Sequence, residues 1–281
     1  MDPAMPPDAL PPQLPVPESP VPDASVSARD PAAPAQGDGQ GAGQGTGQGA
    51  AGLPPLGPRS SAADLAYAYL RQAIITLALP PGTALSRPGI AAHLQVSQTP
   101  VREALLRLQE EKLVEVVPHS ATRVACIDLD DARQGHFLRL AVEVEMVRQQ
   151  ARQAAAGGGP EGLARALPAH LARQRALLAV GDEPGFAAAD DAFHAAFYAA
   201  AGMSGLWRMI HTHSGHLDRL RRLHLPSPGK AEAILRAHEA LAGAVLGGRP
   251  EEAEALLRAH LSDTFTRVEE IRRAHPVFFS L

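Results

Sequence analysis

The second half of the chain carries four side chains whose types and spacing suit a metal ion. Asp190 and His194 are four residues apart, which places a carboxylate and an imidazole on one face of a helix. His238 and His260 follow on two later helical segments. One carboxylate and three imidazoles from separate helices are a common way to build a metal site inside a helical bundle. Their mixed nitrogen and oxygen donors suit Zn, Ni, Mn or Fe, and the sequence leaves the choice among these metals open.

The same residues admit other interpretations. Taken singly, a histidine is more commonly a partly buried or surface side chain than a ligand. The set would also suit a metalloenzyme, such as a hydrolase or oxygenase, which needs a positioned base near the metal-bound water. Within one turn of His238 or His260 the only glutamate is Glu239, which directly follows His238 and should point away from it. We therefore predict a binding site without catalytic residues, and not an enzyme.

Helical periodicity from residue 131 onward would position these ligands. Apolar residues recur at helical spacing, and clusters of Gly and Pro interrupt them at regular intervals. These breaks predict about six helices, near 131–156, 160–180, 183–201, 204–224, 229–247 and 250–274. No alternating strand pattern appears among them. The sequence thus predicts a mainly α protein whose residues 131–281 form an all-helical bundle.

A different pattern fills residues 61–126. Asp64 is a plausible N-cap for a first helix that stops before Pro80, and residues 88–95 form a second, short helix. Ser97 is expected to cap a third helix with its hydroxyl. Two short strands follow, near 113–117 and 122–125. This order predicts a winged helix-turn-helix of three helices and a two-stranded wing, joined to the bundle by a linker at 127–130.

The start of the third helix carries side chains that suit DNA. Gln98, Thr99 and Arg102 are expected to be exposed there, while Val101 and its apolar neighbours face inward. Pro100 fits the first turn of a helix, where its missing N–H costs nothing. A helix that enters the major groove by its first turn uses side chains of these types.

Composition and charge are consistent with this division. The net charge is −4 and the computed pI about 6.3, but residues 59–126 form the one segment with a net positive charge. Residues 1–60 are dominated by Pro, Gly, Ala and Gln and are predicted to be a disordered tail. Cys126 is the single cysteine, so no disulfide can form within the chain. We find no signal peptide and no apolar run that could span a membrane, and predict a cytoplasmic protein.

Residues 64–125 resemble the DNA-binding domain of the GntR superfamily. The run from Ser97 to Leu105 is close to the hallmark Ser-Arg-Thr-Pro-Val-Arg-Glu-Ala-Leu, with Gln98 at a position where arginine is frequent. The resemblance implies that Arg102 and Thr99 contact DNA. The full set of DNA contacts that it implies is Arg87, Ser97, Gln98, Thr99, Arg102, His119 and Arg123.

Residues 131–275 resemble the FCD effector-binding domain of the FadR-type branch of that superfamily. The matching segments are 137–143 in the opening helix, and 237–240 and 258–261 in the last two. The resemblance implies that the four metal ligands fall on Asp190, His194, His238 and His260. It also implies a homodimer that binds an inverted-repeat operator in double-stranded DNA and responds to a small organic acid, with repression as the common outcome. A regulator that senses the metal itself is the alternative.

Three further residues are candidates for holding the carboxylate of that acid. Arg139 can form a paired, charge-assisted hydrogen bond, although an ion pair with Glu143, four residues on, is the competing interpretation. His213 lies on the apolar stripe of the predicted helix 204–224 and should face the interior. His216 flanks that stripe, and its competing interpretation is a surface residue.

Overall fold

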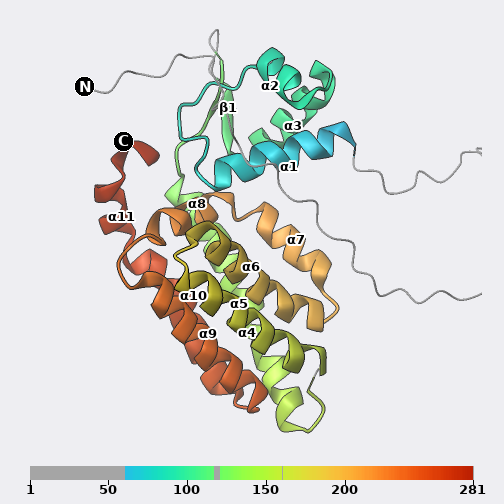
Figure 1. Cartoon of the computed structure of the whole chain (residues 1–281), viewed down its shortest axis with the longest axis vertical. Coiled ribbons are helices and arrows are strands. Elements are labelled where there is room, and N and C mark those ends of the chain that lie inside the picture. Colours follow the sequence, from blue (N-terminus) through green and yellow to red (C-terminus); the bar gives the residue numbers. More distant parts are fainter. Residues whose placement is uncertain (1–60, 117–120, 160, 281) are drawn as a thin grey trace, which may run out of the picture.

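The computed structural model describes residues 61–116, 121–159 and 161–280. Within these ranges a small winged domain sits at one end of a helical bundle, and its first helix lies across that end (Figure 1). The predicted tail at 1–60 and the tip of the wing, which includes His119, lie outside the described residues. Among the described residues, no helix is long and apolar enough to cross a membrane.

The winged domain contains three helices and two strands, as predicted: α1 Ala62–Ile75, α2 Arg87–Leu94, α3 Gln98–Glu110, β1 Val114–Val116 and β2 Thr122–Val124. The prediction that Asp64 caps α1 is wrong. Ser61 is the N-cap, its hydroxyl accepts a hydrogen bond from the Asp64 N–H, and the Asp64 carboxylate accepts one from the Ser61 N–H. This reciprocal arrangement satisfies two backbone donors at the start of the helix.

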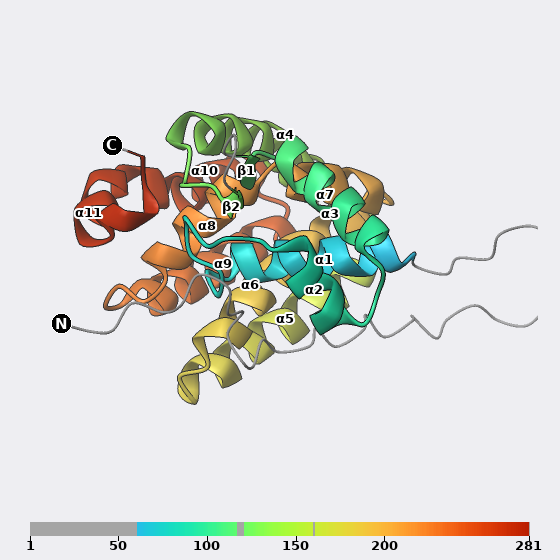
Figure 2. The same ribbon diagram turned by 90° about the horizontal axis from the view of Figure 1, so that it is seen from above.

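The strands pair with each other and with the loop before α2. β1 and β2 are antiparallel, with Val114 opposite Val124. Ala84 forms an additional bridge to Arg123, and the Leu85 N–H donates to the Thr122 carbonyl oxygen at 2.8 Å. The loop is therefore part of the wing, and it ties β2 to the α1–α2 layer. Seen from above, α1 and α3 lie side by side over the bundle (Figure 2).

In the part of the bundle that the structure describes there are eight α-helices rather than about six: α4 Leu129–Ala155, α5 Glu161–Ala179, α6 Glu183–Ala200, α7 Ser204–Thr212, α8 Gly215–His224, α9 Lys230–Leu246, α10 Pro250–Thr266 and α11 Val268–Ala274. Two predicted helices are each divided, 204–224 at residues 213–214 and 250–274 at Arg267. The long α4 packs against α6, α8, α9 and α10 and forms the centre of the bundle.

Close packing accounts for the break between α7 and α8. Gly135 of α4 approaches it so nearly that a Cβ there would lie 3.0 Å from the His213 carbonyl oxygen. A Cβ on Gly215 would lie 2.7 Å from a methyl group of Leu113, just before β1. The Ser214 hydroxyl donates to the Ile210 carbonyl oxygen, which satisfies part of the exposed end of α7. The two glycines thus let α8 begin in contact with both α4 and the winged domain.

The connection between the two domains is held from several sides. The Asp128 carboxylate caps α4 by accepting hydrogen bonds from the N–H groups of residues 130 and 131. The Ile127 N–H donates to the Phe278 carbonyl oxygen at 2.7 Å, and Ile127 forms a parallel bridge with Phe279. Ile127 packs in an apolar cluster with Leu220 of α8 and Ile271 of α11. The last residues of the bundle therefore return to cover the linker.

Candidate metal centre and DNA-reading face

The structure brings together the four residues that the sequence singled out as metal ligands. Asp190 and His194 project from α6, His238 from α9 and His260 from α10. Each offers one ligand atom, and these atoms all lie within 4.8 Å of one another. The His260 Nε2 is 3.2 Å from the His194 Nε2 and 3.1 Å from the His238 Nε2. Such separations suit ligands that share one metal ion at bond lengths of about 2.0–2.2 Å.

Hydrogen bonds behind the histidines set which nitrogen of each ring carries the proton. The His194 Nδ1 lies 2.7 Å from a Glu143 carboxylate oxygen, and the His238 Nδ1 lies 3.0 Å from the Gln174 side-chain oxygen. Because both partners are acceptors, each Nδ1 donates, and in the neutral ring the Nε2 keeps its lone pair. The Asp190 Oδ1, 3.6 Å from the His238 Nε2, is buried and has no hydrogen-bond partner.

Electrostatics favour the metal-binding form of three of the four groups. Burial lowers the pKa of His238 to about 3 against the opposing charge of Asp190, and burial together with the neighbouring imidazoles holds the pKa of His260 well below its usual value. Burial alone would raise the pKa of Asp190, but the charge of Arg221 outweighs it and lowers that pKa. The neutral imidazoles of His238 and His260 and the ionised carboxylate of Asp190 therefore converge with the His194 ring. This donor set fits a divalent transition metal.

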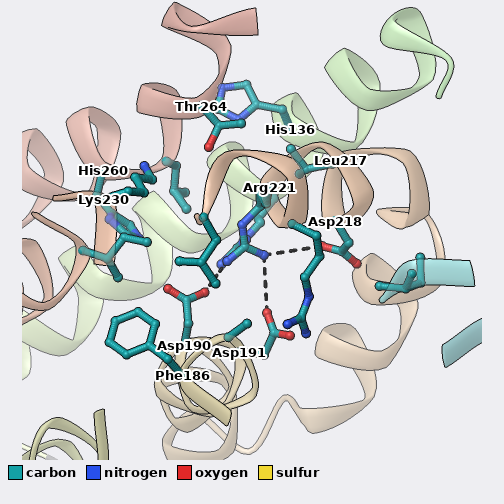
Figure 3. Close-up of a pocket in the computed structure, with 17 residues that line it drawn as sticks. His136, Phe186, Asp190, Asp191, Leu217, Asp218, Arg221, Lys230, His260 and Thr264 are labelled. Carbon is teal, nitrogen blue, oxygen red and sulfur yellow. Dashed lines mark hydrogen bonds and ion pairs between the residues drawn. The ribbon is translucent and has the colours of Figure 1, made fainter. Parts of the chain in front are cut away.

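A cavity opens beside this cluster, with about 710 Å³ of unfilled space including its mouth. Asp190 and His260 lie on its wall, whereas His194 and His238 are fully buried behind them. The other charged and polar residues of the wall include Arg139, Asp191, Asp218, Arg221, Arg222, Lys230 and Thr264, several of which are labelled in Figure 3. One apolar wall residue, Ile75, comes from α1 of the winged domain.

Arg139 lines this cavity, as a residue that binds an acid would, and it also forms the competing ion pair with Glu143. Its Nε donates to a Glu143 oxygen at 2.6 Å, and both side chains are almost completely buried. Burial alone would raise the pKa of Glu143, but Arg139 and His194 outweigh it and lower that pKa to about 2. Among the residues that the structure describes, one terminal nitrogen of Arg139 is buried without a hydrogen-bond partner.

Arg221 is a site residue that the sequence analysis missed. It sits at the centre of the view in Figure 3 and forms ion pairs with Asp190, Asp191 and Asp218. These charges raise its pKa, against the effect of burial. The residue belongs to an arginine-rich stretch of α8, at positions 219, 221 and 222, on a helix expected to be half buried. This group of arginines was the one feature of the sequence that could have pointed to Arg221 as a site residue.

The two histidines proposed for the acid lie outside the cavity wall. His213 is exposed, because it is the C-cap of α7 and its Nδ1 bonds to the Met209 carbonyl oxygen, so the expectation that it faces the interior is wrong. His216 is buried at the domain junction, where its Nδ1 accepts a hydrogen bond from the Asp128 N–H at 3.0 Å. Burial and the nearby Arg219 lower the pKa of His216, which keeps this acceptor available.

The described residues that are expected to contact DNA lie at the starts of α2 and α3 and on β2. Gln98, Thr99 and Arg102 are exposed on the first turns of α3. The proposed Arg87 and Ser97 are exposed at the starts of α2 and α3, and Ser97 makes no side-chain capping bond, contrary to expectation. The proposed Arg123 lies on β2 and donates to the Gly82 carbonyl oxygen at 2.8 Å.

Two families of known sequences match this chain. Residues 62–124 match the family described as bacterial regulatory proteins of the gntR family, and residues 136–263 match the FCD domain. The first covers the winged domain and the second covers α4 to α10 with all four converging ligands. The first family is described as regulatory proteins, and the relatives below are described as transcriptional regulators.

Individual relatives extend over both domains. An uncharacterised HTH-type transcriptional regulator from an unstable DNA locus of Streptomyces ambofaciens is 33% identical over 217 residues, which covers 76% of this chain and 88% of that protein. The HTH-type transcriptional repressor RspR of Escherichia coli K12 is 27% identical and covers 80% and 96%. A solved GntR regulator from Rhodococcus has the same fold, with a TM-score of 0.62, 24% identity, and coverage of 74% and 97%. The chain therefore belongs to the GntR family of bacterial transcriptional regulators and carries an FCD domain.

Proposed function

We propose that this regulator senses a small organic acid at a metal ion held by Asp190, His194, His238 and His260. The observation that carries this proposal is the convergence of those ligand atoms beside a cavity that Arg139 also lines, with one buried terminal nitrogen of Arg139 unpartnered among the described residues. A bound metal would supply a positive centre that accepts lone pairs from a carboxylate. Arg139 would donate hydrogen bonds to the same carboxylate, which gives the ligand two points of recognition.

The second proposed element is a homodimer on an inverted-repeat operator. One winged domain buries too little surface for high specificity, and two-fold operators match two-fold proteins. The α3 helix of each subunit would enter the major groove with Gln98, Thr99 and Arg102 at its first turns. Repression is the proposed outcome, in keeping with the relative named as a repressor. The acid would act through its different affinity for DNA-bound and free forms of the dimer.

The sensing proposal is tested by DNA binding of the full chain in the presence of candidate ligands. A selection from random duplexes supplies the DNA, and metal-loaded protein is titrated with a panel of small carboxylic and hydroxycarboxylic acids. At least one acid should change DNA affinity by roughly 5–150-fold, the usual size of such coupling. A response to the metal alone, unaffected by every acid, would instead identify a metal sensor.

We expect Arg102→Ala to weaken binding to the selected DNA by about 1–3 kcal/mol if the arginine reads a base. The guanidinium is exposed near the first turn of α3, where it can reach a base edge. Filter binding at constant salt measures the loss. Arg107→Ala is the matched control, because Arg107 of the same helix pairs with Asp64 and stacks on Tyr67. Equal affinity of Arg102→Ala and the wild-type protein would remove Arg102 from the recognition surface.

A further inference from the structure

Helix α8 has two faces that touch different parts of the molecule. One face lines the cavity through Leu217, Asp218, Arg221 and Arg222. The opposite face contacts the linker and the winged domain through His216, Arg219, Leu220 and Leu223. The residues of each face are three or four positions apart, as the helical repeat requires. A displacement of α8 would therefore change both the cavity wall and the contacts with the linker and the winged domain.

The cavity side is attached to the candidate metal centre through Arg221. Its guanidinium pairs with one oxygen of Asp190, and the other oxygen faces the His238 Nε2. Asp191 and Asp218 accept further hydrogen bonds from the same guanidinium, at 3.3 Å and 3.4 Å. Arg221 thus holds Asp190 so that its free oxygen points to the histidines. A change at that free oxygen would therefore act on the same Asp190 carboxylate that Arg221 binds.

The other side is attached to the DNA-binding domain by direct contacts. The fully buried Arg219 donates to the Ala125 carbonyl oxygen at 2.8 Å, just after β2. His216 accepts from the Asp128 N–H in the linker. Gly215 packs against Leu113 so closely that it has no room for a Cβ. These contacts leave little freedom for the linker to stay in place while α8 moves.

We propose that Arg221 is a positioning residue that joins Asp190 to α8, and that α8 carries a change at the metal centre to the linker and the DNA-binding domain. This inference rests on the proposed metal site and adds the route by which that site is read. It assigns a role to a residue that neither binds DNA nor ligates the metal. Coupling requires an element that can adopt two arrangements. In this proposal that element is α8, which packs between the cavity and the linker.

Hydrogen exchange of the full-length protein tests the route, with Zn²⁺ and Mn²⁺ as separate probes added to chelator-stripped protein. In the wild-type protein we expect slower exchange on the ligand helices α6, α9 and α10. We also expect a change of roughly fivefold or more, the lower end of typical coupling, at residues 125–129 and in α1. In Arg221→Gln the ligand helices should still respond, and residues 125–129 and α1 should not.

Three further variants keep this test decisive. Arg221→Lys should recover part of the distant response, since it restores a positive charge beside Asp190. Arg222→Gln is the matched control, because Arg222 lines the same cavity but forms no ion pair with Asp190 among the described residues, and it should behave as the wild type. Gly215→Ala alters the end of α8 that packs on Leu113, independently of Arg221. This variant should lose the response in the winged domain, while the ligand helices still respond.

The outcomes separate this inference from the proposed metal site. A wild-type response confined to the ligand helices would overturn the α8 route while leaving the metal site standing. A full distant response in Arg221→Gln would overturn the role of Arg221. The absence of any response to either metal on the ligand helices would remove the metal site itself, and the inference with it.

Discussion

We expect Arg139→Leu to lower the free energy of unfolding by about 3–5 kcal/mol, the usual cost of removing one partner of a buried ion pair. Arg139 and Glu143 are 4% and 3% exposed, so the substitution would leave a buried carboxylate without its cationic partner, hydrogen-bonded to the His194 Nδ1. Urea unfolding of the full chain measures the loss. The matched control is Arg133→Leu on the same helix, whose ion pair with Asp130 is largely exposed and contributes roughly 0–1 kcal/mol.

A second variant distinguishes two costs of Arg139→Leu, that of leaving the Glu143 carboxylate buried without a cation and that of lost packing. Glu143→Gln, added to Arg139→Leu, replaces the carboxylate by a neutral amide whose oxygen can still accept from the His194 Nδ1. We expect this double variant to recover much of the stability that Arg139→Leu loses. A loss below about 1 kcal/mol for Arg139→Leu alone would show that the pair contributes no more than a surface ion pair.

Metal binding should stabilise the fold, and His238→Ala should abolish that effect. At a metal concentration of 100 times the dissociation constant, a ligand of the native state adds about 2.7 kcal/mol to the free energy of unfolding. His238 is fully buried, so no other group can take its place among the ligands. Urea unfolding of chelator-stripped protein, with and without Zn²⁺, measures the difference. A wild-type protein that gains nothing from any tested metal would contradict the expectation.

His224→Ala is the matched control for this experiment. His224 is another buried histidine, but it lies at the end of α8, bonds to Thr264 and is not one of the four converging ligands. We expect its replacement to lower the stability of the protein, while the increment caused by the metal should remain. Equal metal-dependent stabilisation of His238→Ala and His224→Ala would show that His238 is not a ligand.

The elements of the fold were largely predictable from local patterns, because apolar stripes and breaking residues report directly on helices. The winged domain and the bundle follow from these signals, as the family matches confirm. The division of 204–224 was not predictable, since it depends on how closely Gly135 and Gly215 approach neighbouring segments. Treating that stretch as one helix also misplaced His213. Helical spacing predicts a shared face only within one continuous helix, and the helix is interrupted at residues 213–214.

The convergence of the four candidate ligands was accessible from the sequence for a simple reason. The spacing of Asp190 and His194 fixes two ligands on one helix face, and the other two occupy one helix each. Arg221 was not accessible, because its role depends on the rotation of α8 against α6, which brings Asp190 and Asp191 to it. The same holds for Ile75, whose place in the cavity wall depends on the packing of two domains.

We expect one metal ion to bind between the four converging side chains. Crystals of the full chain, grown from protein loaded with Zn²⁺, allow an anomalous difference map on both sides of the zinc absorption edge. We predict a single strong peak per chain at about 2.0–2.2 Å from the Asp190 oxygen and the three histidine Nε2 atoms. A map with no peak there, from crystals in which zinc is bound elsewhere or not at all, would show that these four side chains do not form a metal site.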